Sequence, residues 1–331
     1  MSNLPEDVGS IFEELGDLER EFADVELDAL RRKEHSLKPL YAKRKTLLEG
    51  LPDFWPTVLG NGPEEIQQFF YPADLELVSC IKSFTVERYQ IKSETEGEPR
   101  SLRFTIEFDE NEIIEDTKLV KDFEYKPRED GPGSLVSKPV AIKWKGKKKD
   151  VTHGLLDAAV ELQAAEEALK LKDGKSEVEI VDREALWQHE KLREKMVKLD
   201  EDEELEPSFF NWFGFRGAVD APKAPKKAAE NGSNGAEEED DEDDDDEFDQ
   251  MLEVEIFPAG EEIAITLAEE LWPDAMDYFM SAQDEAPDFD DLDEEDEDED
   301  DDAPELVISE DVLAEKVLEE QSRPSKRQRK A

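Results

Sequence analysis

Two runs of carboxylates are the residues of this chain with the clearest chemical capacity. Residues 237–249 carry 12 acids in 13 positions, and residues 284–302 carry 15 acids in 19 positions. Neither run contains a basic residue. A dense polyanion competes with DNA phosphates for lysine and arginine side chains and releases counterions when it binds them. The two runs therefore indicate a partner rich in positive charge, although a purely solubilising role is an alternative that charge alone leaves open.

The rest of the chain is also acidic. Its 331 residues include 92 acidic and 41 basic side chains, for a formal net charge of −51. Because such a field repels nucleic acid and anionic lipid, we expect no membrane partner and only weak or indirect contact with DNA. The N-terminal sequence MSNLPEDVGS lacks the positive charge of a signal peptide, and no apolar run approaches the roughly 20 residues of a membrane span. We therefore expect a soluble, intracellular protein.

Residues that could support catalysis or bind a metal do not form a recognisable set. Cys80 is the single cysteine, which excludes an intrachain disulfide and zinc sites built on several cysteines. His35, His153 and His189 lie in separate segments without metal-ligand spacing, and no Gly-rich phosphate loop is present. We therefore expect neither an enzyme nor a bound cofactor.

A long helix is expected at residues 10–49, after a flexible N-terminus of residues 1–9. Apolar residues recur there at alternating steps of four and three, as in the seam of a coiled coil, and Pro39 is expected to kink the helix. A helix of about 40 residues spans roughly 60 Å, more than a small domain covers, so we expect it to pair with a second copy of the chain. Packing of the seam on its own domain is the alternative. The expected dimerisation residues are Ile11, Leu15, Leu18, Phe22, Val25, Leu30 and Leu37.

The pattern of residues 50–283 predicts a domain that combines an antiparallel sheet of about four strands with helices. A turn-rich stretch at 51–63 leads into a short helix around Glu64–Phe70. Strands are expected from Leu75 onward in LELVSCIKSFTVERYQI, and then at SLRFTIEFD, LVKDFEYK and KPVAIKWK. Strict alternation of apolar residues makes the second of these the clearest.

The second half of the chain is expected to be helical and then unstructured. Residues 155–205 predict one or two surface helices, and an aromatic cluster at 209–215 marks a return to the core. Residues 217–250 are expected to form a disordered acidic linker. A helix from Glu261 to about Leu271, continued by Asp274–Met280, is the last packed element expected, and residues 284–331 are expected to form a disordered acidic tail.

Four stretches of the sequence resemble the nucleosome assembly protein family, most closely its SET (template-activating factor) branch, including the shorter fungal members. They are PLYAKRKTLLEGLPDFW at 39–55, AIKWKGK at 141–147, PSFFNWF at 207–213 and ELWPDAMDYF at 270–279. They occur in the family's order, with the acidic tail last. The likeness covers roughly residues 10–145, 205–216 and 250–302, whereas 155–205 and 217–250 are longer than the family's usual connections.

The resemblance implies an α+β fold in which two long helices pair antiparallel in a homodimer. Each end then carries an "earmuff" domain, made of an antiparallel sheet with helices, that shelters a concave acidic underside. Core histones would bind there with help from the tail, in the nucleus or while shuttling from the cytoplasm. The resemblance also implies an alternative function, regulation of a histone acetyltransferase, a phosphatase or another chromatin enzyme. A DNA mimic that occupies the groove of a nucleic-acid-binding protein is a third interpretation.

Because the resemblance places the last helix near the underside, its acids and those of the tail are the expected histone-binding residues. For any one of them the alternative is a solvated helix face. The expected residues are Glu261, Glu262, Glu269, Glu270, Asp274, Asp277, Asp288, Asp290, Asp291 and Asp293.

Two basic clusters stand out against the acidic background. Lys143, Lys145 and residues 147–149 surround Trp144, and this patch would touch DNA phosphates, bind the protein's own tail or form an exposed hairpin end. The second cluster resembles a nuclear localisation signal, with unremarkable surface charge as the alternative. It consists of Lys326, Arg327, Arg329 and Lys330.

Overall fold

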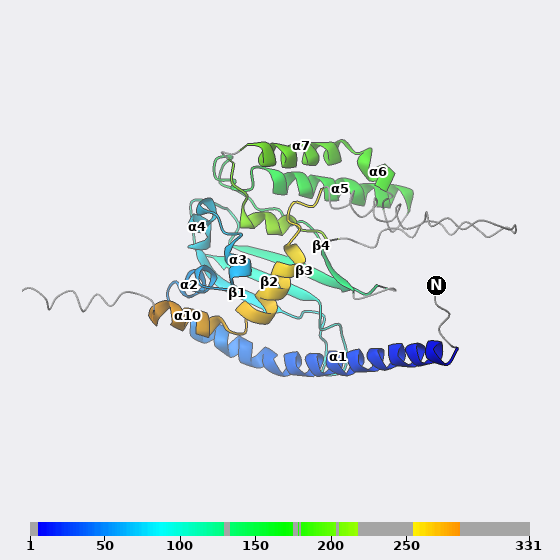
Figure 1. Cartoon of the computed structure of the whole chain (residues 1–331). Coiled ribbons are helices and arrows are strands. Elements are labelled where there is room, and N and C mark those ends of the chain that lie inside the picture. The colour runs from blue at the N-terminus through cyan, green and yellow to red at the C-terminus, as the bar shows by residue number, and fades with distance from the viewer. Residues whose placement is uncertain are drawn as a thin grey trace, which may run out of the picture. The chain divides into compact units, whose positions relative to one another are not determined.

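A four-stranded antiparallel sheet lies at the centre of the fold (Figure 1). The computed structural model describes residues 6–128, 133–174, 178, 180–202, 205–217 and 254–284. These residues belong to one unit within residues 1–285, while a second unit, residues 286–331, lies outside the described residues. The acidic segments predicted to be disordered, 217–250 and 284–331, fall outside them too, apart from Gly217 and Asp284.

The strands follow one another as a simple meander. They are β1 (Ile81–Glu87), β2 (Leu102–Phe108), β3 (Lys118–Lys126) and β4 (Ser134–Ser137), in the order β1-β2-β3-β4. In β2 the alternating residues are all buried, because one face of the strand meets the core. The predicted four-stranded antiparallel sheet is confirmed.

Two of the predicted strands were placed wrongly. Residues from Leu75 to Val78 belong to the helix α4 (Pro72–Val78), because Pro72 fits the first helical turn and the Asp74 carboxylate accepts the Tyr71 amide hydrogen at 3.1 Å. The fourth strand is β4 rather than KPVAIKWK at 138–145, where Trp144 makes only an isolated bridge to Ile114.

Residues 138–145 do not form the predicted strand because the backbone there has other hydrogen-bond partners. Pro139 has no amide hydrogen to donate to a neighbouring strand. The Ser137 and Val140 amides instead donate to the carbonyls of Arg216 and Phe213, at 2.7 and 2.9 Å. The segment after β4 is therefore held by the aromatic helix η1 (Phe209–Gly214) and not by a fifth ladder.

The predicted long helix is observed as α1 (Glu6–Leu48), and it continues through Pro39 as one element. It begins four residues before the predicted start, so residues 6–9 belong to the helix and not to a flexible N-terminus. Figure 1 shows it running along one side of the sheet and extending past it. Its C-terminal half is anchored: Leu48 is buried in the core, and the Lys45 ammonium lies 3.2 Å from the Glu107 carboxylate of β2. Its N-terminal half exposes large apolar side chains, among them Phe22 at 55% and Val25 at 67%.

Short helices pack against the sheet and form the core with it. The stretch 51–63 was predicted to form turns, but part of it forms the helix α2 (Phe54–Gly60). Pro56 is compatible with this helix because it falls in the first turn, where a proline is tolerated. The helix α3 (Glu64–Gln67) is the predicted short one. The predicted aromatic cluster is buried as η1. Its Trp212 ring stacks on Phe123 of β3, with centroids 5.2 Å apart.

The stretch 155–205 forms a helical hairpin with an apolar core of its own. The helices α5 (Leu155–Asp173) and α7 (Trp187–Glu201) pack together and are joined by α6 (Ile180–Glu184). Leu162 and Leu192 are fully buried between them, so the helices are more than surface elements. A buried carboxylate, Glu166, binds Arg183 at 2.8 Å and Arg216 at 2.5 Å, and thereby ties the hairpin to the sheet domain.

Two buried polar groups connect distant parts of the core. The Lys121 ammonium, fully buried on β3, donates to the carbonyls of Lys138, Phe213 and Phe215 at 2.8, 2.9 and 2.6 Å. Burial holds the pKa of Lys121 well below its usual value. Asp74 accepts hydrogen bonds from Ser208 and from the Phe209 amide, and burial raises its pKa despite these bonds. Both residues fix η1 in place.

Candidate functional site

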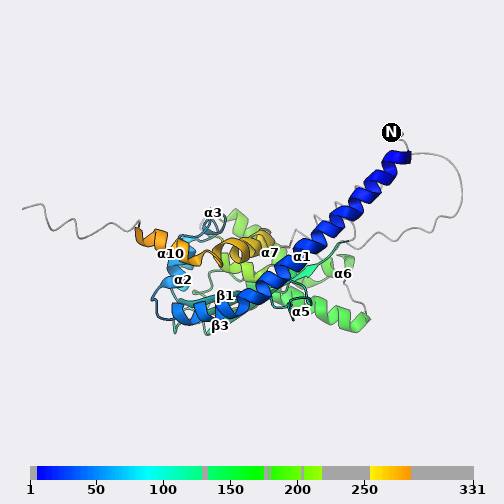
Figure 2. The same ribbon diagram turned by 90° about the horizontal axis from the view of Figure 1, so that it is seen from below.

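The last described segment, residues 254–284, is the most one-sidedly charged part of the described chain. It contains eight acids and no lysine or arginine. It forms the helix α9 (Gly260–Thr266), the π-helical turn η2 (Leu267–Leu271) and the helix α10 (Ala275–Asp284). The predicted helix from Glu261 with its continuation is therefore confirmed. Figure 2 shows these elements on the same side of the molecule as α1.

The π turn and the proline that follows it decide which side chains face outward. The Trp272 amide donates to the Leu267 carbonyl at 3.0 Å, which adds one residue to the helical turn. Pro273 then interrupts the helix because it has no amide hydrogen. Leu271 and Trp272 enter the core, at 0% and 4% exposure, while the acids on either side of them stay exposed.

Four of the six predicted histone-binding acids in this segment have free carboxylates. The side chains of Glu262, Glu270, Asp274 and Asp277 are exposed. No lysine, arginine or histidine among the described residues lies within ion-pair distance of them. They are available to a cationic partner without first losing an internal one.

The other two predicted acids already have partners. The Glu261 carboxylate accepts the Leu135 amide hydrogen at 2.8 Å and so completes the edge of β4. Glu269 pairs with Arg88 at 3.1 Å, although its own side chain is 55% exposed. The structure thus assigns Glu261 a role within the fold and leaves Glu269 only partly free.

Two further acids approach this surface from distant elements. Tyr278 has a raised pKa, chiefly through burial and then through the negative charges of Glu270, Asp274 and Glu65. Tyr41 has a raised pKa for the same main reason, with Glu34 and Asp274 adding to it. Glu65 on α3 and Glu34 on α1 therefore add negative charge near this surface, although Glu34 itself lies 3.9 Å from Arg88. The sequence carries no signal for either, because only the tertiary fold brings them near residue 274.

Two arginines join α1 to the acidic segment. The Arg44 guanidinium donates to the carbonyls of Trp272 at 2.7 Å and Pro273 at 3.1 Å, and it lies over the Trp272 ring at 4.1 Å from the centroid. Arg88, just after the end of β1, lies 3.9 Å from Glu34 and 3.1 Å from Glu269. The long helix and the acidic turn are therefore connected at two points.

The predicted dimerisation residues form an exposed stripe on the N-terminal half of α1. Leu30 and Leu37, nearer the domain, are half-buried. Such a stripe on a helix that leaves its own domain is available to another polypeptide. Exposure is 53% for Ile11, 48% for Leu15, 43% for Leu18, 55% for Phe22 and 67% for Val25.

The basic patch around Trp144 lies beside an acidic loop. Residues 109–116 contain five acids. The Lys145 amide donates to the Ile113 carbonyl at 2.8 Å, and the Lys143 amide donates to the Asp116 carboxylate at 2.7 Å. Lys149 pairs with Glu76 at 3.2 Å. The patch therefore lies in a turn and an isolated bridge and not at the end of a hairpin, and the neighbouring acids compensate much of its positive charge.

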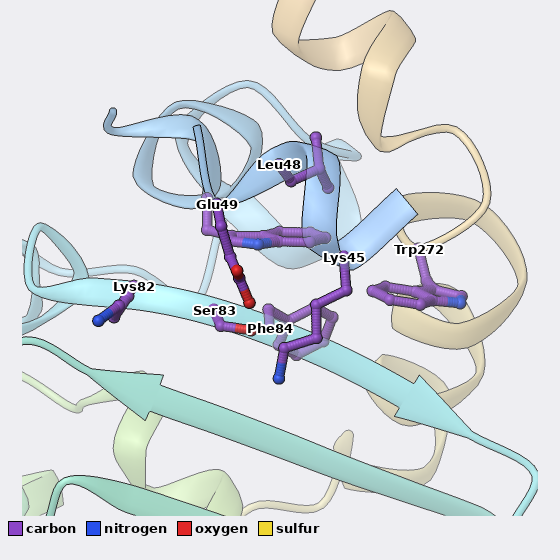
Figure 3. A pocket seen from close by; sticks show the side chains of 8 residues that line it. Lys45, Leu48, Glu49, Lys82, Ser83, Phe84 and Trp272 are labelled. Atoms are coloured by element: carbon purple, nitrogen blue, oxygen red, sulfur yellow. The ribbon is translucent and has the colours of Figure 1, made fainter. Parts of the chain in front are cut away.

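A small cavity lies at the C-terminal end of α1. Figure 3 shows a cavity between α1, α2, β1 and Trp272, with Lys45 and Glu49 beside the Phe84 ring. Its volume of about 10 Å³ is that of a single water molecule. Among the residues that the structure describes, no group of three or more His, Cys, Asp or Glu side chains is arranged to hold a metal ion.

None of the helices among the described residues has the length and the apolar character of a membrane span.

Several predictions concern parts of the chain that the structure leaves undescribed. The tail acids and the C-terminal basic cluster lie outside the described ranges, so their roles stay predictions. These residues are Asp288, Asp290, Asp291, Asp293, Lys326, Arg327, Arg329 and Lys330.

Comparison with known proteins gives one consistent family. A family model described as "Nucleosome assembly protein (NAP)" matches residues 13–282. A Schizosaccharomyces pombe relative named "Putative nucleosome assembly protein C36B7.08c" is 33% identical over 144 residues, which are 40% of this chain and 57% of that protein. "NAP1-related protein 2" of Arabidopsis thaliana is 27% identical over 141 residues, 42% of this chain and 51% of the relative. The chain thus spans little more than half the length of these relatives.

The fold has a counterpart among solved structures. The crystal structure of Vps75 superimposes with a TM-score of 0.51 at 20% sequence identity, over 83% of this chain and 99% of the other. At this level of identity the likeness concerns the fold: a long helix followed by an antiparallel sheet with helices.

Proposed function

Because this chain belongs to the nucleosome assembly protein family, we propose that it is a histone chaperone. In this proposal it binds core histones, shields their charge and promotes nucleosome assembly and disassembly, without catalysing a reaction itself. The confirmed family and the name of the S. pombe relative support histones as the clients. The names of the relatives also make the nucleus the expected site of action.

The observation that carries the proposal is the set of unpaired carboxylates on η2 and α10. Glu270, Asp274 and Asp277 are exposed within a segment that has no basic residue, and Glu262 on α9 adds a fourth charge. A single exposed ion pair contributes only about 0.2–1 kcal/mol, so one acid alone would bind little. Four acids on one rigid segment, reinforced by the tail run 284–302, suit a client with many lysines and arginines.

We also propose that the chain forms a homodimer through α1. Residues 6–30 of the helix contain ten acids and one basic residue, whereas residues 31–48 contain seven basic residues and one acid. In an antiparallel pair the acidic half of each helix faces the basic half of the other, while a parallel pair would align like charges. The exposed apolar stripe supplies the contact, and the charge pattern favours the antiparallel direction.

The proposal is tested by the affinity for each of the two purified core histone pairs, measured by fluorescence across a salt titration. One variant neutralises the free acids, as Glu262→Gln, Glu270→Gln, Asp274→Asn and Asp277→Asn. Its matched control neutralises four exposed acids on other elements, as Glu94→Gln, Glu112→Gln, Glu194→Gln and Glu201→Gln. Both sets are made in the full chain and in a chain that ends at Asp284.

Four lost pairs at about 0.3–1 kcal/mol each predict a loss of roughly tenfold or more in the shortened chain. The control set should change affinity much less. Equal losses in both sets would show that net charge, and not this surface, determines binding. If the unaltered protein failed to bind histones at physiological salt, the proposed function itself would be wrong.

A further inference from the structure

We infer that Arg44 is a positioning residue for the acidic turn that holds Glu270, Asp274 and Asp277. The inference rests on the proposed function, because it concerns how that surface is held in a shape suited to a cationic client. Arg44 lies on α1, in the helix proposed to form the dimer, and more than 220 residues from the turn in sequence. It was not among the residues that the sequence indicated.

The turn needs outside support because its backbone is irregular. The π turn ends at Leu271, and Pro273 interrupts the helix before α10 begins at Ala275. The carbonyls of Trp272 and Pro273 lie in this interruption, and the acidic segment has no cationic side chain of its own to bind them. The Arg44 guanidinium donates to both, at 2.7 and 3.1 Å.

The aromatic rings fix the guanidinium in turn. It lies 4.1 Å from the centroid of the Trp272 ring and 4.8 Å from that of Tyr41. Trp272 is itself held in the core, stacked on Trp55 with centroids 5.7 Å apart and an interplanar angle of 10°. A planar cation with several donors can stack and bind two carbonyls together, whereas a lysine ammonium cannot reproduce that geometry.

The acids of the surface are built on the same turn. Asp274 directly follows Pro273, and its amide donates to the Glu270 carbonyl at 3.2 Å. The Asp274 carbonyl accepts the amide hydrogens of Asp277 and Tyr278 at 2.9 and 3.2 Å. A shift of the Trp272–Pro273 carbonyls therefore moves the backbone of all three acids together.

The sign of the effect separates positioning from charge. Arg44 is a cation beside a surface that attracts cations, so a description by net charge alone predicts that Arg44→Met tightens histone binding. If Arg44 positions the turn, Arg44→Met instead weakens histone binding, because the carboxylates lose their fixed spacing. Lys43 is the matched control: it is adjacent and exposed, and the structure shows no bond or ion pair of its side chain. Its change to Met removes the same charge from α1, so any effect of that charge on the proposed dimer is the same in both variants.

The test is a double-mutant cycle in the full-length chain, with affinity for each of the two purified core histone pairs as the readout. The variants are Arg44→Met, the pair Glu270→Gln with Asp274→Asn, and their combination; Arg44→Lys and Lys43→Met complete the set. The tail is present in every variant, so its contribution cancels in the cycle. Circular dichroism checks that each variant is folded at the assay temperature.

We expect Arg44→Met to weaken binding by about three- to tenfold, while Lys43→Met leaves it unchanged or slightly tighter. The Glu270→Gln and Asp274→Asn pair should weaken binding in the unaltered chain and by less than about twofold in the Arg44→Met background. A general loss of stability would not produce this coupling. Arg44→Lys should show the same coupling to a smaller extent. It replaces Arg44→Met in the cycle if Arg44→Met does not fold.

Additive effects, or an Arg44→Met protein that binds as tightly as Lys43→Met, would overturn the inference and leave the proposed function intact. A lack of effect of the Glu270 and Asp274 changes would overturn the inference and remove this turn from the binding surface. Absence of histone binding by the unaltered chain would instead refute the proposed function.

Discussion

The dimer proposed through α1 gives a prediction whose size follows from the exposure of one side chain. Phe22 lies in the middle of the apolar stripe and is 55% exposed in the isolated chain. Complete burial of a phenylalanine side chain is worth up to about 3 kcal/mol, so covering the exposed half contributes about 1.5 kcal/mol per chain. A symmetric interface contains two copies, which makes about 3 kcal/mol per dimer. Phe22→Ala should therefore raise the dimer Kd by roughly 100-fold.

The assay is sedimentation equilibrium over a dilution series of the full chain. Leu171→Ala is the matched control, because Leu171 on α5 is even more exposed, at 86%, and lies outside α1. It should leave the dimer Kd unchanged. A monomeric unaltered chain at micromolar concentration, or a Phe22→Ala protein with the original Kd, would refute the reasoning that the stripe is an interface.

The same series at several salt concentrations reports the direction of pairing. In an antiparallel pair the ten acids of residues 6–30 face the seven basic residues of 31–48, so added salt screens an attraction and should weaken the dimer. In a parallel pair salt would screen a repulsion and strengthen it. Stronger dimerisation at high salt would therefore contradict the antiparallel arrangement while leaving the apolar contact valid.

Three further predictions concern the scaffold and the tail. Burial raises the pKa of Asp74 in the folded state above its value in the unfolded chain, so folding becomes less favourable as pH rises and Asp74 ionises. The Asp74→Asn variant lacks this charge, so its free energy of unfolding, measured with urea between pH 3 and 7, should rise relative to that of the unaltered chain as pH rises. Lys121→Met leaves three backbone carbonyls without their buried donor and should lower the free energy of unfolding by about 2–4 kcal/mol in the same assay. Deletion of residues 323–331 should shift a fluorescent fusion from the nucleus to the cytoplasm, and a fusion that stays nuclear would contradict the signal proposed there.

The elements with strong periodicity could be predicted from the sequence, and those decided by distant partners could not. The alternation in β2 reflects one buried face and the seam of α1 reflects one apolar stripe, and local sequence records both faithfully. The start of the first predicted strand, Leu75–Val78, reads equally well as strand or helix, and the capping contact of Asp74 decides for helix. The end of β4 and the segment after it depend on the carbonyls of Arg216 and Phe213, which are more than 70 residues away.

The candidate site shows the same division. Sequence identified the acidic segment, because its composition is local. It could not show that Glu261 is bound by Leu135, at a separation of 126 residues, or that Glu269 is paired with Arg88, at a separation of 181. Nor could it show that Glu34 and Glu65 approach the turn. Which acids are free for a client is a tertiary property.

The distribution of positive charge explains how so acidic a chain can still present usable carboxylates. Cations that lie within the folded domain are engaged by backbone carbonyls or buried acids: Lys121 binds three carbonyls, Arg44 binds two, and Arg216 binds Glu166. The exposed bases of α1 lie where a partner helix would bring acids to them. If the dimer forms as proposed, both groups are removed from competition with the client. The surface on η2 and α10 then faces a histone with few internal cations nearby, so neighbouring positive charge does little to weaken its attraction for the client.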